Sequence, residues 1–128
     1  MSKSDEYKRN ELHYVCIDLP KERRDATMKE IIKNGADLNA QDINGWTPLH
    51  FAAQEGDFDV AKALVKKGAN INIRDTNGNT PLWVATMNAN DGSNIIDLLL
   101  SNGANPNETN DHGVSPIEIS PESFNNAT

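Results

Sequence analysis

The fold is decided by the stretch Gly45-Trp46-Thr47-Pro48-Leu49-His50-Phe51-Ala52-Ala53. With the preceding Asp42-Ile43-Asn44, its pattern returns 33 residues later as Asp75-Thr76-Asn77-Gly78-Asn79-Thr80-Pro81-Leu82-Trp83-Val84-Ala85, and a degraded copy starts at Asn110. A second marker, a Gly-Ala dipeptide followed by Asp or Asn, occurs at Gly35, Gly68 and Gly103. Self-similarity at a period of about 20–50 residues is typical of a repeat protein. We therefore expect stacked copies of one structural unit.

Each copy reads as a pair of short antiparallel helices. Thr47-Pro48 and Thr80-Pro81 place a hydroxyl at the helix N-cap and a proline at the first helical position. Gly56 can end the first helix, and the next apolar residues recur at helical spacing until Gly68. Residues 70–78 then cross to the next pair as a projecting, hairpin-like finger rich in turn-forming residues. Because one pair cannot bury its apolar faces alone, the pairs must stack.

This pattern resembles the ankyrin repeat, whose signature is a T-P-L-H-x-A run, a β-turn and two helices. The resemblance implies an all-α solenoid of stacked helix pairs with projecting β-hairpin-like loops, about three repeats and a truncated C-terminal one. We expect a single domain over residues 1–128. Its parts are an N-terminal capping repeat (5–41), a repeat (42–74), a repeat with a two-residue insertion between 88 and 94 (75–109), and a truncated C-terminal cap (110–128).

The two terminal units depart from this pattern. Leu12-His13-Tyr14-Val15-Cys16 aligns with Leu49 to Ala53, but the Thr-Pro pair is absent. The linker from Leu19 to Asp25 is four residues longer than its counterpart and is expected to be an exposed loop carrying Lys21, Arg23 and Arg24. Pro121 is expected to keep the last helix short or to restart it from Ser120. Together with Met1, these departures at both ends favour a complete protein over a fragment of a longer array.

Composition excludes several classes of protein. The 128 residues are 37% hydrophobic, and they offer neither the apolar segment of a signal peptide nor that of a membrane span. Cys16, the single cysteine, cannot form an internal disulfide, so a cytoplasmic protein is expected. All Lys and Arg lie at or before Arg74, and residues 75–128 carry the whole net charge of −7. This charge disfavours nucleic acid and membranes and attracts basic proteins, although it can also serve solubility alone.

No residues suggest catalysis, a cofactor or a metal site. A nucleophile, a base and a pocket at recognisable spacing are missing, so we do not expect an enzyme. His13 and His50 occupy equivalent places in two repeats, where the resemblance implies an imidazole bonded to backbone beside the finger. Cys16 takes a slot for a small buried residue, and His112 stands alone on a finger as a contact residue. Residues 75–86 fail as a calcium loop, because the glycine comes early and the twelfth residue is threonine.

The resemblance implies that partners dock on the fingers and on exposed positions of each first helix. Carried over residue by residue, the helix positions are Ile17, Asp18, Gln54, Glu55, Met87 and Asn88, and the finger positions are Ile43, Asn44, Trp46, Thr76, Asn77, Asn79, Asp111, His112 and Val114. Ile17, Ile43, Trp46 and Met87 would form an apolar strip rimmed by acids. For Trp46, packing and binding weigh equally. Trp83 replaces the usual histidine, so its indole N–H must find another partner, and a structural role is favoured.

Surface recognition is therefore the expected function. The first hypothesis is a module that covers a basic protein, as a monomer or as a heterodimer with it. An acidic repeat protein of this size resembles the small immunity proteins with which bacteria neutralise a cognate toxin, which implies inhibition by occlusion. The alternative is an intracellular adaptor or effector scaffold without an inhibitory role, because the same surface would serve both.

Overall fold

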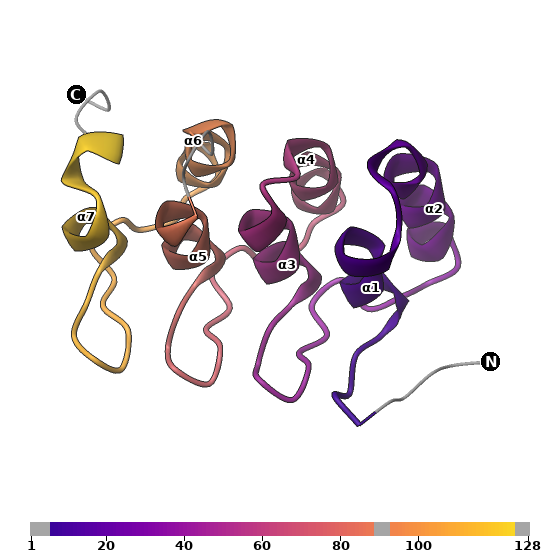
Figure 1. Ribbon diagram of the computed structural model, residues 1–128, viewed down its shortest axis with the longest axis horizontal. Helices are drawn as coiled ribbons and strands as arrows, with labels where there is room; N and C mark the ends of the chain where they lie inside the picture. Colours follow the sequence, from indigo (N-terminus) through magenta and orange to yellow (C-terminus); the bar gives the residue numbers. More distant parts are fainter. Residues whose placement is uncertain (1–5, 89–92, 125–128) are drawn as a thin grey trace.

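The structure is a computed structural model that describes residues 6–88 and 93–124. In this part of the chain the helices form two parallel rows, with the connecting fingers projecting to one side (Figure 1). The inner row is α1, α3, α5 and α7, and the outer row is α2, α4 and α6. Their bounds are α1 Glu11–Asp18, α2 Lys21–Lys33, α3 Pro48–Glu55, α4 Phe58–Lys66, α5 Pro81–Met87, α6 Ser93–Ser101 and α7 Pro116–Ile119, followed by the 3-10 helix η1 Pro121–Ser123. The predicted all-α repeat fold is confirmed.

The inner helices begin as their sequence predicts. Thr47 and Thr80 are N-caps whose side chains accept hydrogen bonds from the backbone N–H groups of His50 and Trp83, and a proline follows each. In the first repeat Asn10 takes the place of threonine and accepts the N–H of His13. Because asparagine caps as well as threonine does, α1 begins properly without a Thr-Pro pair.

The expectation of an exposed loop from Leu19 to Asp25 is wrong. Helix α2 begins at Lys21 and has 13 residues, whereas α4 has 9, so the four extra residues add about one helical turn. Residues 21–30 are mostly good helix formers, which favours this outcome. Arg24 is half-buried: its guanidinium donates to the carbonyl oxygen of Leu19 at 2.9 Å and to Asp57 Oδ2 at 2.8 Å.

The C-terminal unit ends as Pro121 predicts. Helix α7 stops at Ile119, and η1 starts at Pro121 after Ser120. Phe124, which caps η1, is buried and closes this end of the core. The expected insertion between residues 88 and 94 falls largely on residues 89–92, which lie outside the described part of the chain.

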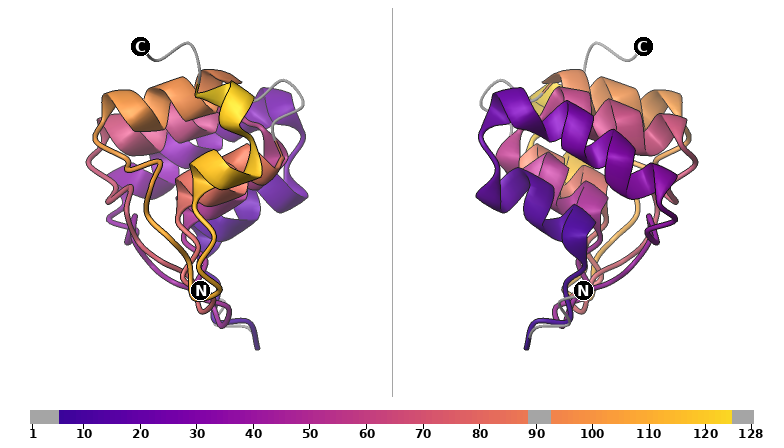
Figure 2. Two further views of the ribbon diagram at one scale, coloured as in Figure 1. Left: turned by 90° about the vertical axis from the view of Figure 1, so that its left-hand side faces the viewer. Right: turned by 90° about the vertical axis from the view of Figure 1, so that its right-hand side faces the viewer.

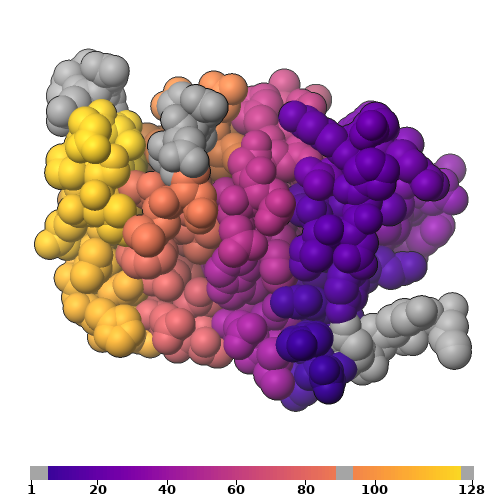
Figure 3. Space-filling view, in the orientation of Figure 1, coloured from indigo at the N-terminus to yellow at the C-terminus, as the bar shows by residue number. Residues whose placement is uncertain are grey.

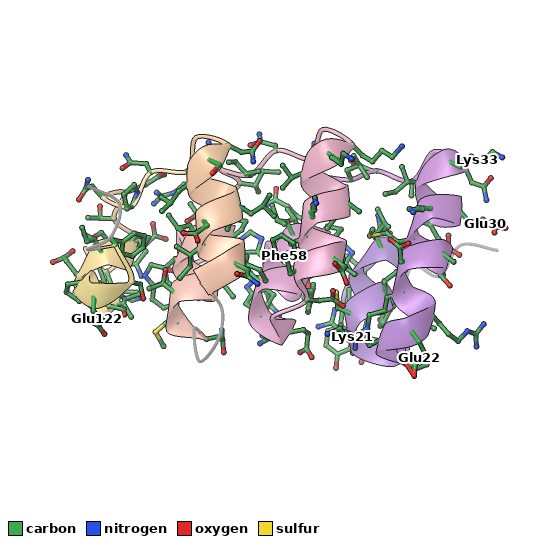
Figure 4. All side chains as sticks on the ribbon, turned by 90° about the horizontal axis from the view of Figure 1, so that it is seen from above. Lys21, Glu22, Glu30, Lys33, Phe58 and Glu122 are labelled. Carbon is green, nitrogen blue, oxygen red and sulfur yellow. The ribbon has the colours of Figure 1, made fainter. Side chains whose placement is uncertain are left out.

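Small and aliphatic side chains hold the rows together. Leu49, Leu82 and Leu99 are fully buried, and Ala52 and Ala61 let neighbouring helices approach closely. Helix α3 packs against α1 on one side and α5 on the other, while α4 lies between α2 and α6 (Figure 4). The units follow one another as successive bands across the molecule (Figure 3). No helix among the described residues is long and apolar enough to cross a membrane.

A backbone ladder joins successive fingers. The N–H of Ile43 donates to the carbonyl of Tyr7 at 2.6 Å, that of Thr76 to Asn44 at 3.1 Å, and that of Asp111 to Asn77 at 2.9 Å. Within each finger, one side-chain oxygen of Asp42, Asp75 or Asn110 accepts two backbone N–H groups of its own turn. The fingers therefore stack in register, as their near-superposition in Figure 2 shows.

Candidate functional site

The predicted helix positions share one exposed surface. We call it the inner-helix face, and it comprises the last residues of α1 and α3 and the end of α5, namely Ile17, Asp18, Gln54, Glu55, Met87 and Asn88, all of which are exposed. Ile17 is 41% exposed and Met87 is 54% exposed. Both are among the few large apolar side chains left in water in the described part of the chain. Ile17 and Met87 lie on α1 and α5, the two helices on either side of α3. Large apolar side chains kept exposed along one row of helices favour an interaction surface.

The inner helices differ in charge from the outer helices α2 and α4. Helices α1, α3, α5 and α7 contain no Lys or Arg. The outer helices α2 and α4 carry Lys21, Arg23, Arg24, Lys29, Lys33, Lys62 and Lys66. Figure 4 shows Lys21 and Lys33 projecting from α2 beside Glu22 and Glu30, so the outer surface is mixed in sign along α2 and α4. Helix α6 has no Lys or Arg, and the charged residues of the inner helices are all acidic.

Asp18 and Glu55 occupy positions that do not stabilise their helices. Each is the last residue of its helix, where the helix dipole disfavours a negative charge. No ion pair involves either carboxylate among the described residues. By contrast Glu118 lies in the first turn of α7, where the N–H and hydroxyl of Ser115 bond to it and lower its pKa. Asp18 and Glu55 would therefore gain from a cation supplied by another molecule.

The predicted finger positions form a second row. Ile43, Asn44, Thr76, Asn77, Asp111 and His112 are exposed at the fingers. They precede the N-termini of the inner helices, whereas the inner-helix face lies at the C-terminal ends. A helix of eight residues, such as α1 or α3, is about 12 Å long, so the two rows are separated by about that distance. A partner that contacts both the finger positions and the inner-helix face must span the length of one inner helix.

Trp46, Asn79 and Val114 are half-buried, unlike the other predicted finger residues. The indole N–H of Trp46 donates to Asp75 Oδ2 at 2.9 Å, and its ring lies 5.5 Å from that of His50 and 4.9 Å from that of Phe51, centroid to centroid. Asn79 accepts the side-chain N–H of Asn110. These contacts favour the packing interpretation of Trp46.

The two equivalent histidines have the expected structural role. Nε2 of His13 bonds to the carbonyl of Trp46 at 2.7 Å, and Nε2 of His50 bonds to that of Asn79 at 2.9 Å. Nδ1 of each ring accepts the backbone N–H of its own N-cap residue, Asn10 or Thr47. Burial lowers the pKa of both imidazoles, although these backbone bonds oppose the shift. Both nitrogens of each ring are engaged in these hydrogen bonds, so neither histidine has a nitrogen free for chemistry.

Trp83 does not find the partner that the sequence analysis required. It is half-buried, and its indole nitrogen is shielded from solvent without a hydrogen-bond partner among the described residues. Val114 occupies the finger position that Trp46 and Asn79 have in the earlier fingers, where their carbonyls bond to a histidine ring. The carbonyl of Val114 accepts the N–H of Asn110. A tryptophan at this place is too large to repeat the histidine geometry, so the link is lost.

Cys16 is packed rather than reactive. It is buried, and burial raises the pKa of its thiol to about 12, so the nucleophilic thiolate is scarce at neutral pH. Over the described residues, no group of three or more His, Cys, Asp or Glu side chains could hold a metal ion.

A cavity at the N-terminal end of the stack was missed by sequence reasoning. It has a volume of about 420 Å³ and lies between α1 and α2, with Tyr14, Val15 and Ile31 among its lining residues. The available signal was the aligned repeat: Tyr14 and Thr27 stand where the second repeat has Phe51 and Val60. A polar change at an inward position indicates a surface that no neighbouring repeat covers.

Comparisons with known proteins agree with the repeat architecture. A family model described as ankyrin repeats, in three copies, matches residues 8–110. The chain is 46% identical over 35 residues to protein phosphatase 1 regulatory subunit 27 of Mus musculus, and equally to that of Homo sapiens. The match covers 27% of this chain and 23% of each relative, so it spans about a quarter of their length. Its 35 residues correspond to about one repeat.

Proposed function

We propose that this chain, which belongs to the ankyrin-repeat family, is a non-enzymatic module that binds a basic protein on its inner-helix face. The observation that carries the proposal is the pairing of exposed apolar side chains with unpaired carboxylates on a row of helices that lacks any basic residue. A partner segment with apolar side chains flanked by Lys or Arg would complement both features.

Ile17 and Met87 supply the apolar part. Fully burying such a side chain contributes roughly 1.5–3 kcal/mol, and about half of each is exposed, so covering both would contribute about 2 kcal/mol. Asp18 and Glu55 contribute orientation and association rate more than affinity, because they are exposed and screened by salt. Binding is therefore expected to weaken at high salt without being abolished.

The consequence of binding that we favour is inhibition by occlusion, as for an immunity protein that neutralises a basic toxin. The acidic surface supports this choice, and covering roughly 800 Å² per partner would block an active site lined with basic residues. The alternative is an adaptor or scaffold. The relatives named as phosphatase regulatory subunits also act through a protein partner, but a match of about one repeat gives no basis for assigning the same partner.

The test is capture from the native source with three immobilised proteins: the unaltered chain, an inner-face variant (Asp18→Lys, Glu55→Lys, Met87→Ala) and an outer-face control (Lys62→Glu, Lys66→Glu). All five positions are exposed, so folding should be retained, which circular dichroism checks. We expect a basic protein that the unaltered chain and the control retain and that the inner-face variant binds about tenfold more weakly. Loss in the outer-face control alone would contradict the proposal.

The captured protein then separates inhibition from scaffolding. Adding one equivalent of this chain should abolish the partner's own activity if it acts by occlusion. Unchanged activity in a stable complex would favour the adaptor.

A further inference from the structure

The cavity between α1 and α2 opens on the side of the first repeat that faces away from the rest of the stack. In the right-hand view of Figure 2 these two helices lie in front of the other repeats. The equivalent side of the second repeat is covered: Phe51 is buried and its ring meets that of His13 edge-on at 5.6 Å. Tyr14, which aligns with Phe51, lines the cavity instead.

The lining combines an apolar floor with a polar rim. Val15, Leu19 and Ile31 are the aliphatic residues of the lining. Thr27 and Glu11 replace Val60 and Pro48 at the aligned positions. Another tightly stacked helix pair would desolvate these polar groups at a cost in free energy. A single inserted side chain would cover the floor and leave the rim in water.

The charge of the rim indicates what should accompany that side chain. Glu11 and Asp18 line the cavity, whereas none of the Lys or Arg residues that the structure describes does. Asp18 ends α1, where the helix dipole disfavours its charge. Of the cations in the first turns of α2, Arg24 is bound to Asp57, and the exposed Lys21 and Arg23 are not part of the lining. A cation from another molecule is thus the natural complement of Asp18.

We propose that this cavity is the second anchor of the partner-binding surface, taking one partner side chain of leucine to phenylalanine size whose neighbouring Lys or Arg pairs with Asp18. The volume of about 420 Å³ is large enough to admit a side chain of that size. Asp18 belongs both to the cavity and to the inner-helix face, so one segment can engage both. This inference rests on the proposed function and adds the chemistry of one contact.

The experiment titrates N-acetyl-Phe-Arg-amide into the ¹⁵N-labelled full chain and follows backbone amide shifts by NMR. We expect saturable shifts centred on Val15, Asp18 and Ile31. N-acetyl-Ala-Arg-amide should give no saturable shift there, because it lacks the large apolar group. N-acetyl-Phe-Glu-amide should bind about threefold more weakly than the Arg probe, since a like charge then faces Asp18. Equal binding of the Arg and Glu probes would overturn the assigned cation.

A matched pair of variants on α2 provides the second arm. Thr27→Phe fills the cavity from a half-buried position, whereas Ala26→Phe adds the same ring at the adjacent exposed residue outside the lining. We expect the first to abolish the shifts and the second to leave them. Binding that persists in folded Thr27→Phe would overturn the proposal.

Two other outcomes would also overturn it. Shifts confined to Gln54 and Met87 would leave the proposed function standing and remove the cavity as an anchor. Concentration-dependent dimerisation in sedimentation, lost in Thr27→Phe, would identify a second copy of the chain as the occupant. Conversely, if the cavity binds the Phe-Arg probe while the captured partner binds a Glu55→Lys, Met87→Ala variant as tightly as the unaltered chain, the proposed function alone would be wrong, because neither residue lines the cavity.

Discussion

The second and third repeats open with the same Thr-Pro-Leu sequence, yet each is joined to the following finger in a different way. In the second repeat, His50 is fully buried and links the N-cap Thr47 to the carbonyl of Asn79 in the next finger. His13 makes the same link one repeat earlier. We call these contacts the histidine rungs, and they place a neutral imidazole between the helix start and the adjacent finger.

The third repeat has Trp83 in place of the histidine, and its links move outward to the finger. Arg74 donates to Glu108 Oε2 at 2.8 Å and to the carbonyl of Thr109 at 3.0 Å, and it pairs with Asp111 at 3.3 Å. Exposed ion pairs of this kind contribute little to stability and weaken with salt. One repeating unit is therefore held by buried bonds at the centre of the stack and by solvated bonds at its C-terminal end. Four substitutions or conditions test it, ordered by expected effect.

The largest effect should come from breaking the junction between fingers at Gly45. Its φ is 77°, and a Cβ there would lie 2.7 Å from the backbone nitrogen of Thr76. Gly45→Ala should therefore lower the free energy of unfolding by about 4 kcal/mol, combining backbone strain with a clash. Gly113→Ala is the matched control, because its φ is 78° but nothing lies within 4 Å of its Cβ. Urea unfolding should give about 1 kcal/mol for the control, and equal losses would contradict the close approach.

Removing a histidine rung should have the second-largest effect on stability. His50→Ala leaves the carbonyl of Asn79 and the N–H of Thr47 each without this bond and opens space in the core. We expect a loss of about 3 kcal/mol in urea unfolding followed by circular dichroism. A loss below about 1 kcal/mol would mean that water or a neighbour replaces the rung.

The rungs also predict a pH dependence. Burial lowers the pKa of His13 and His50 below the 6.5 of the unfolded chain. Below pH 6.5 the unfolded state binds protons that the folded state does not, so stability falls as pH drops from that value towards the folded pKa values. Each histidine contributes a slope of up to about 1.4 kcal/mol per pH unit.

Urea midpoints at pH 7.5 and 5.5 measure this slope. His50→Ala should reduce it by one histidine's share, even though that variant is less stable at both pH values. An unchanged slope would show that His50 does not stay neutral in the fold.

The smallest effect should be at the tryptophan junction. Trp83→Phe removes an indole N–H that is shielded from water without a partner among the described residues. Removing that unpaired group offsets the packing that is lost with the smaller ring, so we expect unchanged stability or a gain of up to about 1 kcal/mol. Thermal and urea unfolding would check this, and a clear loss would mean that the N–H is bonded in solution.

Much of the fold could be predicted from sequence because its signals are local. Thr47-Pro48 and Thr80-Pro81 carry their capping geometry in two adjacent residues, and the 33-residue period states that the units repeat. The predicted exposure of Ile17 and Met87 also follows from that register. The linker after Leu19 could not be inferred in this way, because alignment counts extra residues without saying whether they extend a helix.

The repeating helix pair, the caps at Thr47 and Thr80 and the exposed positions of the inner helices could be inferred from sequence, since each depends on chain neighbours or on periodic spacing. The histidine rungs reach the following repeat, and their role was implied by the resemblance to the ankyrin repeat. Tertiary packing set the bond from Arg24 to Asp57 across repeats, the bond from Trp46 to Asp75 in the next finger, and the lack of a hydrogen-bond partner for the Trp83 indole among the described residues. It also created the cavity beside Tyr14. The reason is physical: burial and hydrogen bonding of a side chain depend on what packs opposite, and residues opposite one another here are about one repeat apart in sequence.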